Sequence, residues 1–291
     1  MSVVLAATIA CSVAVLGMAA VSAGSYTWRR TTAARHAAVL EQLRRHGSAP
    51  PKPFSSADLA GLPDPVARYF AFALPEGQRR IRAAKIQWTG EMRLQPKAPW
   101  KPYTAAQLFT ASPPGIVWDA DFKMMPLLSV RVRDSYIGGV GSMLARIGGL
   151  VSMVDVSGTR EMAQGSLVRW LGEAVWFPTA LLPGEGVRWE PIDASSARAT
   201  VTDGDLSVSA DFHFAPSGEP LRCTAMRYRD VNGKGVLTPF EGTYQRCTRE
   251  NGVMVPSAAE VAWTLPEEGR FAYWRGSPTT VEFDLGDEAK A

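Results

Sequence analysis

Few residues in this chain have the types and spacing that catalysis or metal binding requires. Its three histidines are His36, His46 and His213. The first two precede the predicted folded region, so only His213 is available there as a base or a ligand. The sequence lacks His-Glu-x-x-His, Cys-x-x-Cys, Gly-x-Ser-x-Gly and Gly-x-x-x-x-Gly-Lys-Ser/Thr motifs. We therefore assign no catalytic residue, and we expect no metal and no cofactor.

Paired carboxylates are the remaining acid candidates. Asp119 and Asp121 share one face of a predicted strand, and two close carboxylates can raise one pKa, as a glycosidase or aspartyl site needs. Arg131 and Arg133 on the next predicted strand favour a structural ion-pair ladder instead. Glu173 and Glu241 are weaker candidates. A hydrolase that uses Asp119, Asp121, Glu173 or His213 on membrane-derived substrates is therefore an alternative hypothesis, and it requires at least two of these groups in one cleft.

Aromatic bulk on core-facing positions is the more prominent feature. The chain has nine tryptophans, and most lie in or beside predicted elements. Ordinary core packing explains them, and so does an apolar pocket between a curved sheet and a helix, which suits an acyl chain. The predicted ligand-binding residues are Trp88, Trp118, Phe122, Trp170, Trp176 and Trp189.

The elements that position these residues are mostly strands. Apolar and polar residues alternate over 86–94, 116–124, 128–133, 206–214 and 281–285, which predicts antiparallel strands with one buried face. Helices are predicted from Asp64 and around Leu167–Ala174, whereas 141–158 is ambiguous between strand and helix. The predicted fold class is α+β: one strongly curved, half-barrel-like antiparallel sheet with helices on one face, over residues 54–286.

The N-terminal segment predicts a membrane anchor. Val3 to Ala23 carries no charge, a length that fits the ~20 residues a transmembrane helix needs. The segment is followed by Tyr26 and Trp28, where an interfacial aromatic belt would lie, and then by several arginines. By the positive-inside rule these arginines predict that the domain is cytoplasmic. The alternatives are a cleaved signal peptide ending near Ala23 and an exported domain. The predicted divisions are an anchor (1–28), a basic stalk with a Pro-rich linker (29–53), the domain (54–286) and a tail (287–291).

The distribution of charge along the chain favours some classes of binding partner over others. The chain has 31 basic and 28 acidic residues, but the excess lies in the stalk, and the domain is slightly acidic. This argues against a nucleic-acid partner and for attraction of the stalk to anionic lipid headgroups. Cys11 lies in the anchor, and Cys223 and Cys247 either pair or remain free.

Several sequence segments resemble a family of bacterial membrane-anchored proteins of unknown function. They are 113–120, 132–136, 176–183 and 273–276, which include Pro-Pro-Gly-Ile-Val-Trp-Asp-Ala and Trp-Phe-Pro-Thr-Ala-Leu-Leu-Pro. The resemblance implies one N-terminal membrane helix and no known activity. More loosely, the strand pattern is similar to the lipoprotein-carrier (LolA/LolB/LppX-like) superfamily, which implies a curved sheet holding lipid against helices.

The leading hypothesis is a single-pass membrane protein whose domain binds a hydrophobic ligand, lipid or acyl chain, without catalysis. The hydrolase is one alternative. A structural module that recruits a partner to the membrane is the other, and it predicts an exposed apolar patch.

Overall fold

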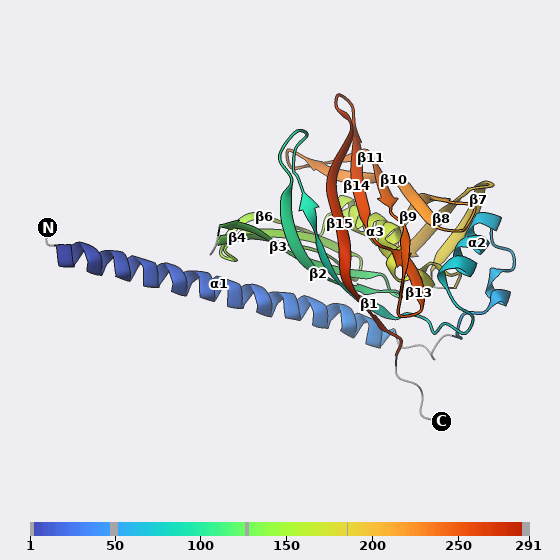
Figure 1. Ribbon diagram of the computed structural model, residues 1–291, viewed down its shortest axis with the longest axis horizontal. Coiled ribbons are helices and arrows are strands. Elements are labelled where there is room, and N and C mark those ends of the chain that lie inside the picture. The colour runs from blue at the N-terminus through green and yellow to red at the C-terminus, as the bar shows by residue number, and fades with distance from the viewer. Residues whose placement is uncertain (1–2, 47–51, 126–127, 185, 287–291) are drawn as a thin grey trace.

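The computed structural model describes residues 3–46, 52–125, 128–184 and 186–286, and within the first helix it describes the side chains of residues 12, 15 and 17 onward. Figure 1 shows a long N-terminal helix beside a curled sheet. The predicted tail (287–291) and residues 47–51 of the predicted linker lie outside the described residues. The helices are α1 (Val3–Arg45), α2 (Asp64–Ala73) and α3 (Arg160–Glu173), with short 3-10 turns at Ser56–Leu59, Ala174–Trp176 and Pro178–Leu181.

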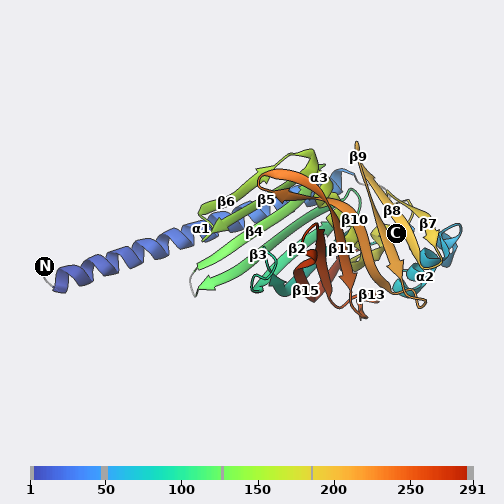
Figure 2. The same ribbon diagram turned by 90° about the horizontal axis from the view of Figure 1, so that it is seen from above.

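A 13-stranded antiparallel sheet forms the body, in the order β6-β5-β4-β3-β2-β1-β15-β14-β11-β10-β9-β8-β7, and β12 and β13 form a separate pair. Figure 2 shows that this sheet curls into a half-barrel, as the alternating pattern predicts. The strands are β1 (Ala83–Met92), β2 (Lys101–Thr110), β3 (Gly115–Met125), β4 (Leu128–Ile137), β5 (Val140–Ile147), β6 (Val151–Ser157), β7 (Val187–Asp193), β8 (Ser196–Asp203), β9 (Leu206–Phe214), β10 (Pro220–Val231), β11 (Lys234–Tyr244), β12 (Cys247–Glu250), β13 (Val253–Pro256), β14 (Ala259–Leu265) and β15 (Gly269–Asp284).

The ambiguous segment 141–158 forms strands β5 and β6 and the hairpin between them. Gly148 and Gly149 both have positive φ in that hairpin, a conformation that glycine adopts without steric cost. The chain therefore reverses there instead of continuing as a helix.

The concave face of the sheet holds the main core. Helix α3 lies across it and contacts β5, β9 and β10, because its buried side chains include Leu167, Trp170 and Leu171. Helix α2 closes the far end, where Tyr69 and Phe70 pack against the rings of Phe214 and Trp189.

The convex face carries the C-terminal half of α1. Val39 and Leu43 of the helix are buried against Ala83, Leu108 and Val117 of the sheet. The predicted stalk is thus continuous with the predicted anchor as one helix, and the stalk packs on the domain. Within the described residues, no helix combines the length and the apolarity that crossing a membrane requires.

A polar junction fastens α1 to the convex face; it consists of Trp28, Thr32, Asp119 and Arg133. The Asp119 carboxylate accepts hydrogen bonds from Trp28 Nε1 at 2.8 Å and from Thr32 Oγ1 at 2.6 Å. Arg133 donates to the Trp28 carbonyl at 3.0 Å and to Thr32 Oγ1 at 2.6 Å, and its guanidinium lies 4.3 Å from the indole centroid. Charge-assisted bonds at partly buried positions hold the helix in one register.

One histidine lies beside this junction. His36 belongs to α1, and its burial against the sheet lowers the pKa of the imidazole; the nearby Asp119 carboxylate opposes that effect, and Arg133 and Lys85 add to it. The imidazole is therefore neutral in the docked helix near neutral pH.

Candidate functional site

Three of the six predicted ligand-binding residues lie in the packed core. Each of these indoles is buried and donates to a main-chain carbonyl: Trp170 to Thr110, Trp176 to Pro256 and Trp189 to Leu181. Trp189 lies among the rings beneath α2, away from the other five. Their hydrogen bonds fix them in the scaffold, and Trp176 also packs on Trp88, with ring centroids 4.9 Å apart.

The other three join an aromatic cluster on the concave face, which consists of Trp88, Tyr103, Trp118, Phe122 and Trp274. Ring centroids lie 5.6 Å apart for Trp88–Trp274, 5.7 Å for Tyr103–Trp118 and 5.5 Å for Tyr103–Phe122. The buried Trp88 and Trp118 Nε1 atoms have no hydrogen-bond partner among the described residues. Buried indole donors normally find a partner, so these two N–H groups are exceptions within the core.

Tyr103 is the central member, and two glycines make room for it. Gly90 and Gly276 are directly paired on β1 and β15. A methyl group added to either would lie 2.7 Å or 2.6 Å, respectively, from the Tyr103 hydroxyl. Burial raises the pKa of this phenol, so it stays protonated. Tyr103 is not among the residues predicted from the sequence, and only the strand pairing reveals why glycine occupies both positions.

From this cluster an apolar face extends across β4, β5 and β6. Directly paired residues in an antiparallel sheet share a face, and the pairing gives three rows across the four strands from β3. They are Phe122–Val130–Ile147–Val151, Ala120–Val132–Ala145–Val154 and Trp118–Asp134–Met143–Val156. We name the concave apolar residues of β4–β6 the apolar wing: Val130, Val132, Met143, Ala145, Ile147, Val151, Val154 and Val156.

Exposure increases along these rows toward the sheet edge. Phe122 is 9% exposed, whereas Val151, at the far end of the same row, is 62% exposed. Helix α3 covers only one end of the wing, where a methyl group on Gly141 would lie 2.7 Å from the Met162 carbonyl carbon. The wing is thus a solvent-facing continuation of the core, a kind of surface that marks interaction sites.

Charged groups border the inner end of the wing. Arg169 of α3 lies 5.0 Å from the Trp118 ring centroid and donates to Asp134 at 2.9 Å and to Glu173 at 2.6 Å. Gln107 donates to the second Glu173 oxygen at 2.7 Å. Desolvation opposes the charge of Arg169, but the two carboxylates outweigh it and raise the pKa of the guanidinium. Glu173 is thus a structural partner of Arg169.

Comparison with models of protein families shows to which family the chain belongs. Residues 52–276 match a family of unknown function, DUF6544. The chain belongs to this family. That membership confirms the resemblance seen in the sequence, and it brings no activity with it.

Two solved structures are similar in chain path. A LolA superfamily protein from Nitrosomonas europaea is 10% identical with a TM-score of 0.40, and the match covers 79% of this chain and 94% of that one. A DUF1329 family protein from Desulfovibrio piger is 11% identical with a TM-score of 0.39, covering 82% and 96%. A search of curated proteins finds no match.

The residues of the hydrolase hypothesis do not meet in one cleft. Asp119 and Asp121 lie on the convex face, where they contact α1 and Arg131, whereas Glu173 lies on the concave side. His213 is on β9, separated from β3 by β2, β1, β15, β14, β11 and β10. Among the described residues, no group of three or more acidic, histidine or cysteine side chains is placed to hold a metal ion.

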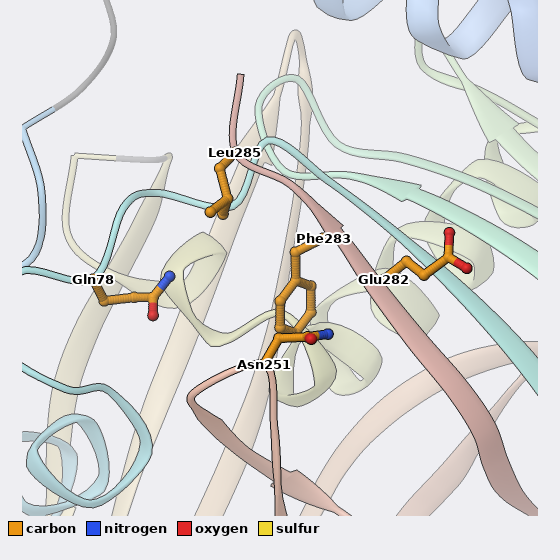
Figure 3. Close-up of a pocket in the computed structure, with 5 residues that line it drawn as sticks. All are labelled: Gln78, Asn251, Glu282, Phe283 and Leu285. Carbon is orange, nitrogen blue, oxygen red and sulfur yellow. The ribbon is translucent and has the colours of Figure 1, made fainter. Parts of the chain in front are cut away.

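A pocket of ≈ 380 Å³ lies at the end of β15 and is lined by Gln78, Asn251, Glu282, Phe283 and Leu285. Figure 3 shows the Glu282 carboxylate directed away from the Asn251 amide and the Phe283 ring. Asn251 Nδ2 donates to the Val281 carbonyl at 2.7 Å. The polar groups therefore do not converge, and the pocket is a weaker candidate than the apolar wing.

The two domain cysteines are free thiols, and both are buried. Burial raises the pKa of Cys223 to about 11 and that of Cys247 to about 12. Both thiols are thus protonated and unreactive near neutral pH.

Proposed function

We propose that this protein is a membrane-anchored, non-enzymatic domain that binds a lipid acyl chain on its apolar wing. The observation that carries the proposal is the unbroken run of apolar side chains from Phe122 to Val151 and from Ala120 to Val154. An acyl chain laid there would remove exposed apolar surface from water at its outer end and contact aromatic rings at its inner end.

The size of the surface fits this ligand. From β3 to β6 the apolar rows that include the wing extend about 14 Å at ~4.8 Å per strand, close to the ~15 Å of hydrocarbon in one bilayer leaflet. The unpartnered Trp118 indole N–H at the inner end is a donor for an ester or carboxylate oxygen. Arg169, 5.0 Å from the centroid of the same ring, is already paired with Asp134 and Glu173, so a neutral ester oxygen fits this end better than a carboxylate.

The uncharged segment 3–23 supports membrane anchoring, and the arginines that follow it support a cytoplasmic domain. Carbonate extraction of cell membranes tests the anchoring, and the full chain is expected in the pellet. A reporter fused to the C-terminus tests the side of the membrane, and activity only in the exported orientation would overturn the cytoplasmic assignment.

Lipid binding is tested with a charge placed on the wing. The variant Val154→Asp puts a carboxylate on an edge strand at a side chain 37% exposed, where folding tolerates it. The full-length protein in mild detergent is titrated with a fluorescent fatty acid, and native mass spectrometry records lipids that co-purify. Because the acyl chain would have to bury or displace the carboxylate, binding is expected to weaken at least about tenfold, or ~1.4 kcal/mol.

The matched control is Val236→Asp on β11, which is 44% exposed and outside the wing. It is expected to bind like the wild type. Equal affinity for the two variants and the wild type would mean that no acyl chain occupies the wing.

Partner recruitment is a second candidate, because β6 is an edge strand of the sheet and its apolar side chains are exposed. A partner strand would pair with the β6 backbone. The register shift opposite Ala145/Arg146 and the Asp155 side chain on this strand are features that discourage edge pairing. The apolar residues also lie on the face of the sheet, which favours a ligand on the face.

A further inference from the structure

Two hairpins place apolar side chains at the end of the domain from which α1 projects. Met125 and Leu128 end the paired part of the β3–β4 hairpin, and Leu150 lies in the β5–β6 hairpin. We name these three the tip residues. Figures 1 and 2 both show these hairpins at the edge nearest the N-terminal part of the helix, which continues past them.

A close contact fixes the level of the tips along α1. A methyl group at Gly24 would lie 2.5 Å from the Gly148 carbonyl oxygen and 2.6 Å from Leu150 Cγ. The β5–β6 hairpin therefore touches the helix at Gly24, directly after the uncharged residues 3–23. At 1.5 Å per residue, a helix of that length spans about 30 Å, the thickness of a bilayer's hydrocarbon core. The domain begins at the level where such a core would end.

Basic side chains lie just behind the tips. Lys123 precedes Met125 by two residues, Arg131 follows Leu128 by three, and Arg146 precedes Leu150 by four. At ~3.3 Å per residue these positions lie about 7–13 Å from the tips. Arg131 and Arg146 are directly paired across β4 and β5.

Helix α1 adds the exposed Arg29 and Arg30 on its side of the same band. The acidic side chains nearby are Asp121, which Arg131 contacts at 3.5 Å, Asp155 on β6, and Asp119, whose charge Arg133 offsets. Positive charge therefore dominates this level of the molecule. Apolar tips backed by a basic band match the order of hydrocarbon and anionic headgroups at a bilayer surface.

We propose that the tip residues insert into the interfacial layer of the membrane that α1 enters, so that the apolar wing opens at the bilayer surface and receives its acyl chain laterally from membrane phospholipid. This rests on the proposed anchoring and goes beyond it, because an anchor alone does not orient a domain. Docking of α1 through Trp28, Thr32, Asp119 and Arg133 makes helix and sheet one body, so the tilt of the helix sets the depth of the tips.

The test measures lipid contact at a tip. In a Cys11→Ser background, Leu150→Cys and Ile192→Cys are each labelled with an NBD fluorophore at pH 7, where the buried Cys223 and Cys247 thiols stay unreactive. Leu150 and Ile192 are both 48% exposed, and Ile192 is on β7, at the opposite edge of the sheet. The full-length proteins are reconstituted in phosphatidylcholine–phosphatidylglycerol vesicles with or without doxyl-labelled lipid. Leu128→Cys provides a second tip position.

Labels at positions 150 and 128 are expected to shift to the blue and to be quenched by doxyl lipid at least about threefold more than the label at 192, since interfacial apolar groups lie ~5–10 Å deep. Carbonate-resistant protein whose labels at 150 and 128 stay as unquenched as the label at 192 would overturn the proposal and leave the anchoring intact. Blue-shifted labels that doxyl lipid does not quench would also overturn it, because a second copy would then cover the tips. Protein released by carbonate would overturn the anchoring and this proposal together.

Discussion

The junction between α1 and the convex face allows the most direct test of the structure. The substitution is Asp119→Ala, which removes the acceptor for Trp28 Nε1, at 2.8 Å, and for Thr32 Oγ1, at 2.6 Å. It also removes the carboxylate beside Arg133, a side chain that is buried in the junction. We expect α1 to leave the sheet while the rest of the domain stays folded.

The magnitude follows from these contacts. Hydrogen bonds to a charged group contribute about 1.5–3 kcal/mol each, and Asp119 accepts them from two side chains. Because Asp119 is only partly buried, the lower end applies to each, and docking of α1 is expected to weaken by about 3 kcal/mol. That corresponds to a more than hundredfold larger population of undocked helix.

The assay is limited trypsin digestion of the full-length protein in detergent micelles. Trypsin is expected to cleave the variant after Arg29, Arg30 and Arg35 at least about tenfold faster than the wild type, because cleavage follows the undocked population. The matched control is Asp121→Ala on the same face of β3. Its single ion pair, at 3.5 Å to Arg131 with the Asp121 side chain 34% exposed, contributes less than about 1 kcal/mol. If the two variants were cleaved at the same rate, our account of the junction would be wrong.

Two further predictions concern the aromatic cluster and the pH response. Gly90→Ala places a methyl group 2.7 Å from the Tyr103 hydroxyl and 2.8 Å from the Gly276 Cα. The free energy of unfolding in urea should therefore fall by ~1–3 kcal/mol. The control is Gly17→Ala, which has nothing within 4 Å and should change the free energy of unfolding by no more than about 1 kcal/mol. A comparable loss in both variants would contradict the packing described. Burial lowers the pKa of His36 below its unfolded value of 6.5, so below that pH the undocked state binds more protons than the docked state. The contribution of neutral His36 to α1 docking is therefore fully present above pH 6.5 and is lost as the pH falls below it. Tryptic cleavage of α1 should therefore rise between pH 7 and 5.5 in the wild type and rise less in His36→Gln, whereas His213→Gln, remote on β9, should follow the wild type.

Much of the architecture was predictable from local pattern. Alternation over 116–124 and 128–133 identifies β3 and β4 because a half-buried strand exposes every second side chain. The pattern did not predict that Val151, Val154 and Val156 form a strand, because a short apolar segment between glycines is compatible with either a helix or a strand. The positive φ of Gly148 and Gly149 decides it.

The candidate site was predictable only in part. Trp118 and Phe122 alternate with Asp119 and Asp121, so their concave orientation follows from the sequence. Tyr103 was missed, because its role depends on Gly90 and Gly276, which come from strands far apart in the chain.

By itself, the sequence determined the strands with clear alternation, such as 116–124 and 128–133, the face on which their side chains lie and the uncharged N-terminal run, because these depend on residue type and on spacing of a few residues. Tertiary structure alone decided that Trp170, Trp176 and Trp189 are scaffold while Val154 and Val156 stay exposed, and that Asp119 holds α1 and does no acid–base chemistry. The reason is physical: burial, hydrogen-bond partners and close approach depend on which distant segments meet, and strand pairing and helix docking set those meetings.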